Sequence, residues 1–348
     1  MPKDDISQTE IDLNLRFILS VFDYVIGRKP IDREITYGLN QLKAGRDPRD
    51  YVLELTVSPE ARRNLSAPLF VPPGHYYSPI VNVAELIASR TEQPVTSDLL
   101  EIDVDPKRQF ALFRKLSAHF GRIPFPVTQT GDFRYYFENN FYSYGDALTL
   151  SAFIQQFKPN RIIEVGCGFS SAVILDTLDH MSAPHSNTSC VFVDPFPDRV
   201  KPLLRPNDHK RVTIIEKPVQ QVDLALFSGL EENDILFLDT THVLKTGSDV
   251  HHELFKILPR LNPGVLIHFH DVFDGFEYPD AWVLHENRSW NELYALRAFL
   301  MYNSKYKIML MNATVAKHYP DEARSISCDF MKNPGGALWL RKGTSSPD

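Results

Sequence analysis

The pattern of hydrophobic residues changes near residue 160. Before that point, apolar residues recur at helical spacing, first at Leu15, Ile18, Val21, Phe22 and Val25. Gly27 and Pro30 predict the end of this first helix, because helices often end at glycine and proline cannot continue one. Further helices are predicted over residues 32–44, 48–57, 107–121 and 146–157. The N-terminal part of the chain is therefore predicted to be helical.

After residue 160, short β-rich runs alternate with helical stretches. Seven strands are predicted, over residues 161–166, 190–195, 212–217, 234–239, 265–271, 307–311 and 337–342. Helix-like segments separate the first five, and this alternation predicts βαβ crossovers with helices on both faces of the sheet. No obvious helix separates the last two strands, which predicts a final antiparallel strand. The fold class is therefore α/β, with a seven-stranded, mostly parallel sheet.

The 348 residues are enough for more than one domain. We expect a helical module over 1–65 and a connector or cap over 66–145, which is rich in proline and aromatic residues. The α/β domain is expected over 146–348. The runs GRKP, GLNQLKAG and YVLELTVSPE of the first part resemble a short helical module of bacterial surface and glycan-related proteins. Ile31 stands where that module prefers Asp, and three helices that merely pack as a cap are the alternative.

Composition excludes several classes of function. The net charge of -7 argues against a nucleic-acid partner, which requires a basic face. Cys167, Cys190 and Cys328 lie far apart without a CxxC pair, so neither a disulfide framework nor a zinc site is expected. The acidic N-terminus has no signal-peptide pattern, and no apolar run reaches the roughly 18 residues of a membrane span. A cytoplasmic protein is expected.

The stretch IIEVGCGFSSA, residues 162–172, is the most informative motif. A buried strand leads into Gly166-Cys167-Gly168, and a helix begins near Ser170. Glycines let the backbone approach a ligand closely, and the start of a helix offers free N–H groups. A dinucleotide site prefers a third glycine where Ser171 stands. Asp194, at the end of the second strand, could accept hydrogen bonds from ribose hydroxyls; the alternative is a turn residue in an Asp-Pro pair.

Together with Glu164, these glycines form an E-x-G-x-G motif, and the motif and strand order resemble class I methyltransferases that use S-adenosylmethionine (SAM). In that family the loop glycines lie against the methionine part of SAM, and the loop after strand three contacts adenine. The resemblance implies a SAM site formed by Glu164, Gly166, Cys167, Gly168, Ser170, Ser171, Asp194, Gln220 and Asp239.

Acidic residues and histidines follow two neighbouring strands. Strand four ends at Asp239, three residues before His242, and strand five ends at His270-Asp271. Ligands of open α/β sheets bind at the carboxyl ends of the strands, so these groups are expected to meet. In one interpretation, Asp239, His270 and Asp271 hold a divalent metal, as in some small-molecule O-methyltransferases. His270 departs from that pattern, because imidazole suits zinc, manganese or iron better than magnesium.

In a second interpretation of the same residues, His242 or His270 is a general base that Asp239 or Asp271 orients. In a third, these histidines only shape the pocket. The runs LDTTHVLKTGSDV and PRLNPGVLIHFHDVFDGFEYP resemble a subgroup of bacterial methyltransferases. Lys245, Ser248 and Asp249 are candidate substrate contacts, and so are Tyr278, Trp282, His285, Arg288 and Trp290. His251-His252-Glu253 is expected on the surface.

The sequence thus predicts a SAM-dependent methyltransferase that modifies an oxygen of a small molecule or a glycan component. Its catalytic residues would be His242, His270 and Asp271. Two alternatives remain open: a metal-dependent, hydroxylase-like enzyme on the same fold, and a non-catalytic module that docks to a cell-envelope assembly. Whether the chain forms a homo-oligomer is left open as well.

Overall fold

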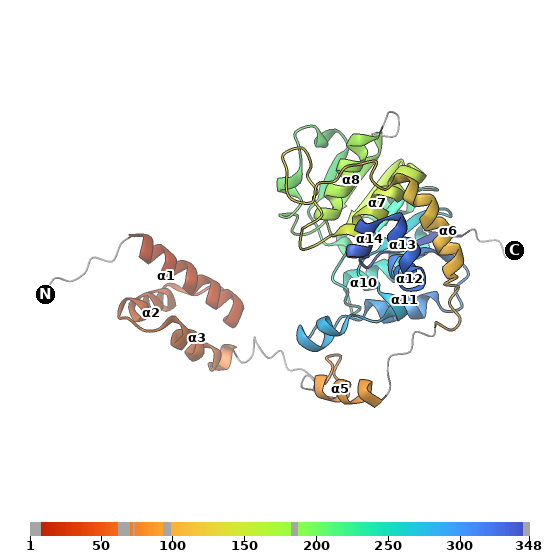
Figure 1. The fold of residues 1–348 in the computed structure, drawn as a ribbon. Helices are drawn as coiled ribbons and strands as arrows, with labels where there is room; N and C mark the ends of the chain where they lie inside the picture. Colours follow the sequence, from red (N-terminus) through yellow and green to blue (C-terminus); the bar gives the residue numbers. More distant parts are fainter. Residues whose placement is uncertain (1–7, 62–69, 72–73, 93–98, 182–186, 344–348) are drawn as a thin grey trace. The chain divides into compact units, whose positions relative to one another are not determined.

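A computed structural model describes residues 8–61, 70–71, 74–92, 99–181 and 187–343. The chain divides into two compact units, Met1–Leu86 and Ile87–Asp348. Helices form the first unit, and the second contains the sheet (Figure 1). Residues 106–145 belong to the second unit and supply buried side chains to the same core as the sheet, among them Phe113 and Tyr135. The division expected at residues 65 and 145 remains a prediction.

The first unit is built from helices α1 (Gln8–Val21), α2 (Asp32–Lys43) and α3 (Pro48–Thr56), close to the predicted ranges. Gly27, in the left-handed conformation at φ 78°, ends the turn that follows α1, as predicted. Gly38 lets α2 approach its neighbours, because a Cβ there would lie 2.6 Å from the Tyr51 hydroxyl and 2.8 Å from Ile18 Cδ1. This unit therefore has a small core of its own.

Arg28 links distant parts of the first unit. Its guanidinium lies 2.8 Å from the carboxylate of Glu34 and 2.7 Å from that of Glu60. Arg28 belongs to the GRKP run and Glu60 to the SPE run, so the two ends of the noted motif meet in space. Helix α5 (Val83–Glu92) follows along the chain.

The second unit contains a seven-stranded sheet in the order β3-β2-β1-β4-β5-β7-β6. The strands are β1 (Arg161–Val165), β2 (Ser189–Val193), β3 (Val212–Ile215), β4 (Ile235–Leu238), β5 (Leu266–Phe269), β6 (Tyr306–Met311) and β7 (Leu338–Lys342). The first five are parallel, and β7 runs antiparallel to both β5 and β6. The predicted α/β class, strand number and antiparallel ending are confirmed.

Helices surround this sheet (Figure 1). They are α6 (Pro106–Leu116), α7 (Tyr144–Phe157), α8 (Phe169–His180), α9 (Leu224–Ser228), α10 (Asp249–His252), α11 (Glu292–Leu300), α12 (Asn312–His318), α13 (Pro320–Ile326) and α14 (Cys328–Lys332). α7 packs against α8 and α14, and α6 packs against β6. None of the helices in the described ranges is long and apolar enough to cross a membrane.

The segment between β6 and β7 differs from the prediction. It was expected to have no helix, yet it contains α12, α13 and α14. Each of these helices has seven residues or fewer. Helical periodicity is recognised over windows of about 11–18 residues, so such short helices leave no clear pattern in the sequence.

Alternate residues of the strands face opposite sides of the sheet. On one side, Phe192, Phe237 and Trp339 join the core formed with α6, α7 and α8. Trp339 stacks on Phe153 of α7 with ring centroids 3.9 Å apart. On the other side, Ile163, Leu236 and Ile267 are also buried. A sheet buried on both faces explains why its strands are almost continuously hydrophobic.

A buried ion network fixes the segment that precedes α7. The Arg134 side chain is 2% exposed and lies 2.7 Å from Asp176, 2.7 Å from Asp179 and 2.8 Å from Asp208. The backbone N–H groups of Arg134 and Tyr135 also donate to Asp176. This network ties the predicted cap segment to α8 and to the turn before β3.

We expect Arg134→Ala to lower the free energy of unfolding of the second unit by about 3–5 kcal/mol, because it leaves buried carboxylates without their cation. Urea unfolding followed by tryptophan fluorescence measures this, since all three tryptophans, Trp282, Trp290 and Trp339, lie in that unit. Arg114→Ala, at an exposed site on α6, is the control. Equal midpoints for the two variants would contradict the proposed importance of the network.

Candidate functional site

Two adjoining cavities lie at the carboxyl ends of the parallel strands. The larger, about 370 Å³, is lined by residues that follow β1, β2, β3 and β4. The smaller, about 170 Å³, lies against the glycine loop after β1. Gly166, Asp194, Asp239 and Thr240 line both. The cavities therefore surround the end of β1, on either side of which the strand order runs in opposite directions, and such switch points are the usual ligand sites of open α/β sheets.

The glycine loop requires its glycines. Gly166 has φ +80°, and a Cβ there would clash with the carbonyl oxygen of Asp239. The loop is held from two sides, because the Gly166 N–H donates to the Val193 carbonyl and the Asp239 N–H donates to the Val165 carbonyl. Gly168 then caps the N-terminus of α8, whose first N–H groups have no carbonyl partner within the helix and can bind a polar ligand.

Glu164 lies beneath this loop and is fully buried. Its two carboxylate oxygens each accept a hydrogen bond of 2.5 Å, one from the Ser170 hydroxyl and one from the Ser171 hydroxyl. Burial raises the pKa of Glu164 to about 8, although the two serine donors oppose the shift. Glu164 and Ser171 do not line either cavity. Their geometry supports the loop from below.

The other predicted cofactor residues gather at the cavities. Gly166, Cys167, Gly168, Ser170, Asp194, Gln220 and Asp239 line one or both of them. Asp194 accepts from the Cys167 N–H at 3.1 Å and from the Phe196 N–H at 2.7 Å. Gln220 donates to the Gly247 carbonyl at 2.9 Å and thereby joins two loops at the rim.

The predicted metal ligands also come together. Single ligand atoms of Asp239, His270 and Asp271 all lie within 4.8 Å of one another. His270 Nε2 is 3.5 Å from Asp271, and His270 Nδ1 is buried without a hydrogen-bond partner among the described residues. His268, one alternation deeper in β5, is fully buried and stacks on Phe237.

His242 stands beside this cluster. Its Nε2 is 3.4 Å from Asp239 and 3.4 Å from Asp271, and its Nδ1 is 2.7 Å from Glu292. The His242 carbonyl accepts hydrogen bonds from the N–H groups of Asn291 and Glu292, which precede and begin α11. Burial lowers the pKa of His242, but the carboxylates of Asp239 and Glu292 outweigh it and hold this pKa well above its usual value.

Sequence reasoning missed several acidic residues of this region. Glu292 is buried against His242, and Asp146 of α7 is buried near His270, with its pKa raised to about 7 mainly by burial. Glu253 was expected on the surface, and this prediction is wrong. Its side chain is fully buried at the start of a π-helical turn, Glu253–Ile257, and lies 3.5 Å from the Thr240 hydroxyl. No spacing in the sequence links these residues to the histidines.

The predicted substrate contacts have mixed positions. Trp290 lies against the His242 ring, with centroids 4.5 Å apart. The Arg288 guanidinium lies over the rings of Trp282 and Trp290, at 4.1 Å and 4.6 Å. His285 is exposed, whereas Tyr278 is buried.

In the loop after β4, two of the candidate substrate contacts accept hydrogen bonds from backbone N–H groups. The Ser248 hydroxyl accepts from the N–H groups of Lys245 and His251. Asp249 accepts from the N–H and the hydroxyl of Thr241, and it also lines the larger cavity. Ser248 and Asp249 therefore shape this loop, whatever else they contact.

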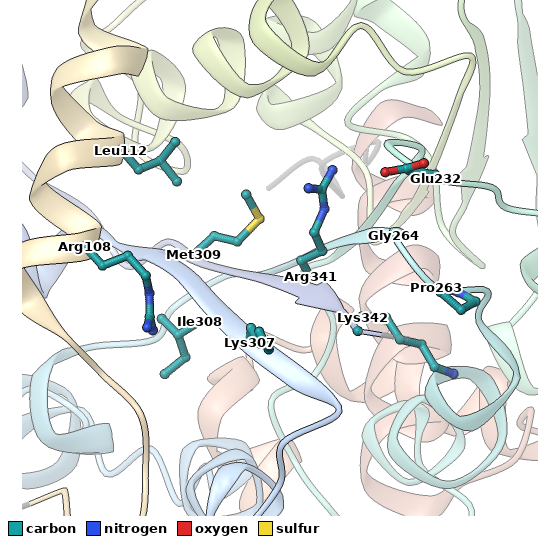
Figure 2. A pocket seen from close by; sticks show the side chains of 11 residues that line it. Arg108, Leu112, Glu232, Pro263, Gly264, Lys307, Ile308, Met309, Arg341 and Lys342 are labelled. Carbon is teal, nitrogen blue, oxygen red and sulfur yellow. The ribbon is translucent and has the colours of Figure 1, made fainter. Parts of the chain in front are cut away.

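A separate cavity of about 500 Å³ lies at the opposite edge of the sheet (Figure 2). Its walls include Leu112 of α6, Gly264 before β5, Met309 of β6 and Arg341 of β7. None of the predicted site residues lines it. The amino ends of parallel strands are not the usual ligand edge of such sheets, so we assign the functional site to the carboxyl edge.

Comparison with known proteins relates the same part of the chain to methyltransferases. A family model described as "Methyltransferase domain" matches residues 163–272, which contain the glycine loop, Asp194, Asp239 and the β5 residues His270 and Asp271. A protein of Archaeoglobus fulgidus, described only as an uncharacterized protein, is 32% identical over 173 residues, which are 47% of this chain and 75% of that protein.

Solved structures of methyltransferases are also similar. An O-methyltransferase family protein from Burkholderia thailandensis is 14% identical, with 99% of this chain and 100% of that chain covered and a TM-score of 0.36. An O-methyltransferase from Bacillus cereus in complex with SAH is 10% identical, with 75% and 97% covered and a TM-score of 0.35.

We expect Glu164→Gln to change how the stability of the second unit depends on pH. The folded-state pKa of about 8 lies above the ordinary value of 4.5, so the folded protein keeps a proton that the unfolded chain releases between these values. The wild type should therefore lose stability relative to the variant as pH rises through this window, by about 1.4 kcal/mol per pH unit.

Urea unfolding followed by tryptophan fluorescence at several pH values between 5 and about 8 measures this difference. Glu231→Gln, at an exposed site, controls for the loss of a carboxylate elsewhere. A difference between wild type and Glu164→Gln that does not vary with pH would show that Glu164 is ionised in the folded protein.

Proposed function

Because the chain belongs to the class I SAM-dependent methyltransferases, we propose that it methylates an oxygen of a small hydroxylated molecule or of a glycan component. One observation carries this proposal: Asp239 lines both cavities at the glycine loop and also belongs to the cluster with His270 and Asp271. A group that is shared in this way brings an acceptor hydroxyl next to the cofactor.

The cavity residues divide into parts that suit different parts of SAM. Asp194, at the end of β2, would accept hydrogen bonds from the ribose hydroxyls. Val219 and Gln220 line the larger cavity and would contact the adenine. The glycine loop and the start of α8 would lie along the methionine part. Bound SAM supplies an electrophilic methyl group, so the protein has to position the acceptor and take up its proton.

We infer that Asp239, His270 and Asp271 bind a divalent cation beside the acceptor. Besides Asp239 and Asp271, the buried carboxyl groups of Asp146, Glu253 and Glu292 lie in the same region. Burying that many carboxyl groups is costly unless they are protonated or a cation compensates their charge, and a divalent ion at the cluster would do the latter. The mixed imidazole and carboxylate ligands suit manganese, iron or zinc. Such an ion would orient an acceptor hydroxyl and make its proton easier to remove.

The histidine beside this cluster has a defined orientation. The His242 Nδ1 atom lies within hydrogen-bond distance of the Glu292 carboxylate, so Nε2 is directed at Asp239 and Asp271. Trp290 lies against the ring. Without a cation, Asp239 and Glu292 keep this ring protonated. A divalent ion bound by Asp239 and Asp271 would offset their negative charge, and Nε2 could then accept the proton of a hydroxyl bound at the cluster. The general-base interpretation of His242 and the cation interpretation of His270 are compatible in this arrangement.

Isothermal titration of the full chain with SAM and with S-adenosylhomocysteine (SAH) tests the proposal. The titrations are repeated after EDTA treatment and with added Mn²⁺. We expect micromolar binding of both nucleosides, and methyl transfer from labelled SAM to phenols or sugars that depends on the divalent ion. Methyl transfer that survives complete metal removal would favour His242 alone, and absence of any SAM binding would refute the methyltransferase proposal.

We expect Asp194→Ala to weaken SAM binding by about 100-fold, because two hydrogen bonds to a carboxylate are lost. Calorimetry measures the affinity, and tryptophan fluorescence confirms that the variant is folded. Asp223→Ala removes an aspartate that begins α9 away from the cavities, and it serves as the control. Unchanged affinity of Asp194→Ala for SAM would exclude Asp194 from the cofactor site.

We expect His270→Ala to weaken Mn²⁺ binding at least tenfold and to abolish methyl transfer, while the affinity for SAM changes by no more than about twofold. Titration with Mn²⁺, followed by electron paramagnetic resonance, measures the first effect without requiring a known acceptor. His251→Ala, at the start of α10, is the histidine control. Parallel loss of SAM and Mn²⁺ binding would instead indicate that His270 maintains the structure.

A further inference from the structure

Arg199 lies where the methionine part of SAM would end. It lines the smaller cavity together with Gly168, Asp194 and Asp239. A Cβ built on Gly168 would lie 2.8 Å from Arg199 Cδ and 3.8 Å from its Nη1. The guanidinium therefore reaches the glycine loop at the start of α8. Arg199 and Asp194 belong to the same loop after β2. The sequence motifs predicted a role for Asp194 but none for Arg199.

Aromatic rings hold this guanidinium in place. It lies 4.0 Å from the centroid of the Phe141 ring, an arrangement in which the cation and the ring attract each other. Phe141 in turn stacks on Phe169, the first residue of α8, with centroids 5.8 Å apart and an interplanar angle of 16°. Arg199, Phe141 and Phe169 thus form a column above the first turn of the helix.

The charges around the smaller cavity are unevenly distributed. Asp194 and Asp239 are its acidic residues, and Arg199 is the one cationic side chain among the described residues that line it. The methionine part of SAM carries an ammonium group, a sulfonium and a carboxylate. Asp239 and Asp194 are suited to positive charge, but neither suits the carboxylate. A guanidinium, by contrast, offers a planar pair of N–H donors to a carboxylate.

We propose that Arg199 binds the α-carboxylate of the cofactor's methionine part, with the N–H groups at the start of α8 as additional donors. This inference rests on the proposed function as a SAM-dependent enzyme. It identifies Arg199 as the residue by which the protein distinguishes SAM and SAH from nucleosides that lack the α-carboxylate. The chain would accordingly prefer SAM and SAH over their decarboxylated counterparts, and that preference would depend on Arg199.

Calorimetry of two ligands against four proteins tests this inference. The ligands are SAH and S-adenosyl-3-thiopropylamine, which is SAH without its carboxylate. The proteins are the wild type, Arg199→Gln, Arg199→Lys and Lys201→Ala. Lys201 is a matched control, because it is an exposed cation two residues away whose partner is Glu216, at 2.9 Å.

Arg199→Gln should weaken SAH binding by ~10- to 100-fold and change binding of the decarboxylated ligand by no more than about twofold. Arg199→Lys should keep part of the preference, since it retains the charge without the planar pair of donors. Lys201→Ala should leave both affinities unchanged. A loss of affinity that occurs for SAH but not for the decarboxylated ligand indicates a contact with the carboxylate. The four affinities form a double-mutant cycle in which one ligand group and one side chain are removed in turn.

Three results would overturn the inference. An equal decrease in the affinity of Arg199→Gln for both ligands would mean that Arg199 only shapes the loop. Unchanged SAH binding in that variant would mean that another group binds the carboxylate. A similar loss in Lys201→Ala would indicate a general effect of positive charge. A wild type that binds neither ligand would instead refute the proposed cofactor itself, which separates the two failures.

Discussion

The close approach of two backbone segments at Gly166 determines the layout of the whole site. Because Gly166 has no Cβ, the carbonyl of Asp239 can lie directly against it, and β1 and β4 end side by side. Asp239 is therefore shared between the glycine loop and the cluster formed with His270 and Asp271. Any other residue at position 166 would separate the cofactor loop from the acidic groups.

The acidic cluster requires support from segments outside β4 and β5. The first turn of α11 holds His242 through its backbone carbonyl and through Glu292. On the other side, the Gly336 carbonyl accepts from the Val272 N–H, and Gly336 lies so close to Asp271 that a Cβ there would be 2.8 Å from the Asp271 Cα. These contacts explain how His242 and Asp271 are kept at positive φ, a backbone conformation that residues other than glycine rarely adopt.

Ion pairs and buried hydrogen bonds fix the two ends of helix α8, which begins at the smaller cavity. Arg134 binds Asp176 and Asp179 near the C-terminal end of α8 as well as Asp208, and Glu164 supports the other end of the same helix through Ser170 and Ser171. α8 is thereby fixed at both ends, which keeps its N-terminal N–H groups directed at the smaller cavity. The column of Arg199, Phe141 and Phe169 depends on the same fixed helix.

The sequence by itself determined the α/β class, the seven strands and the meeting of the glycine loop, Asp194, Asp239 and the β5 residues at one edge. Strand periodicity and glycine spacing are local properties, and parallel strands bring their carboxyl ends together by necessity. Only the tertiary structure decided that Glu292 lies against His242, fifty residues away along the chain, or that Glu253 is buried. The short helices α12, α13 and α14, the Arg134 network and the position of Arg199 belong to the same group. Each depends on the packing of segments that are distant in sequence or on a single turn of helix, and neither leaves a periodic pattern in the order of the amino acids.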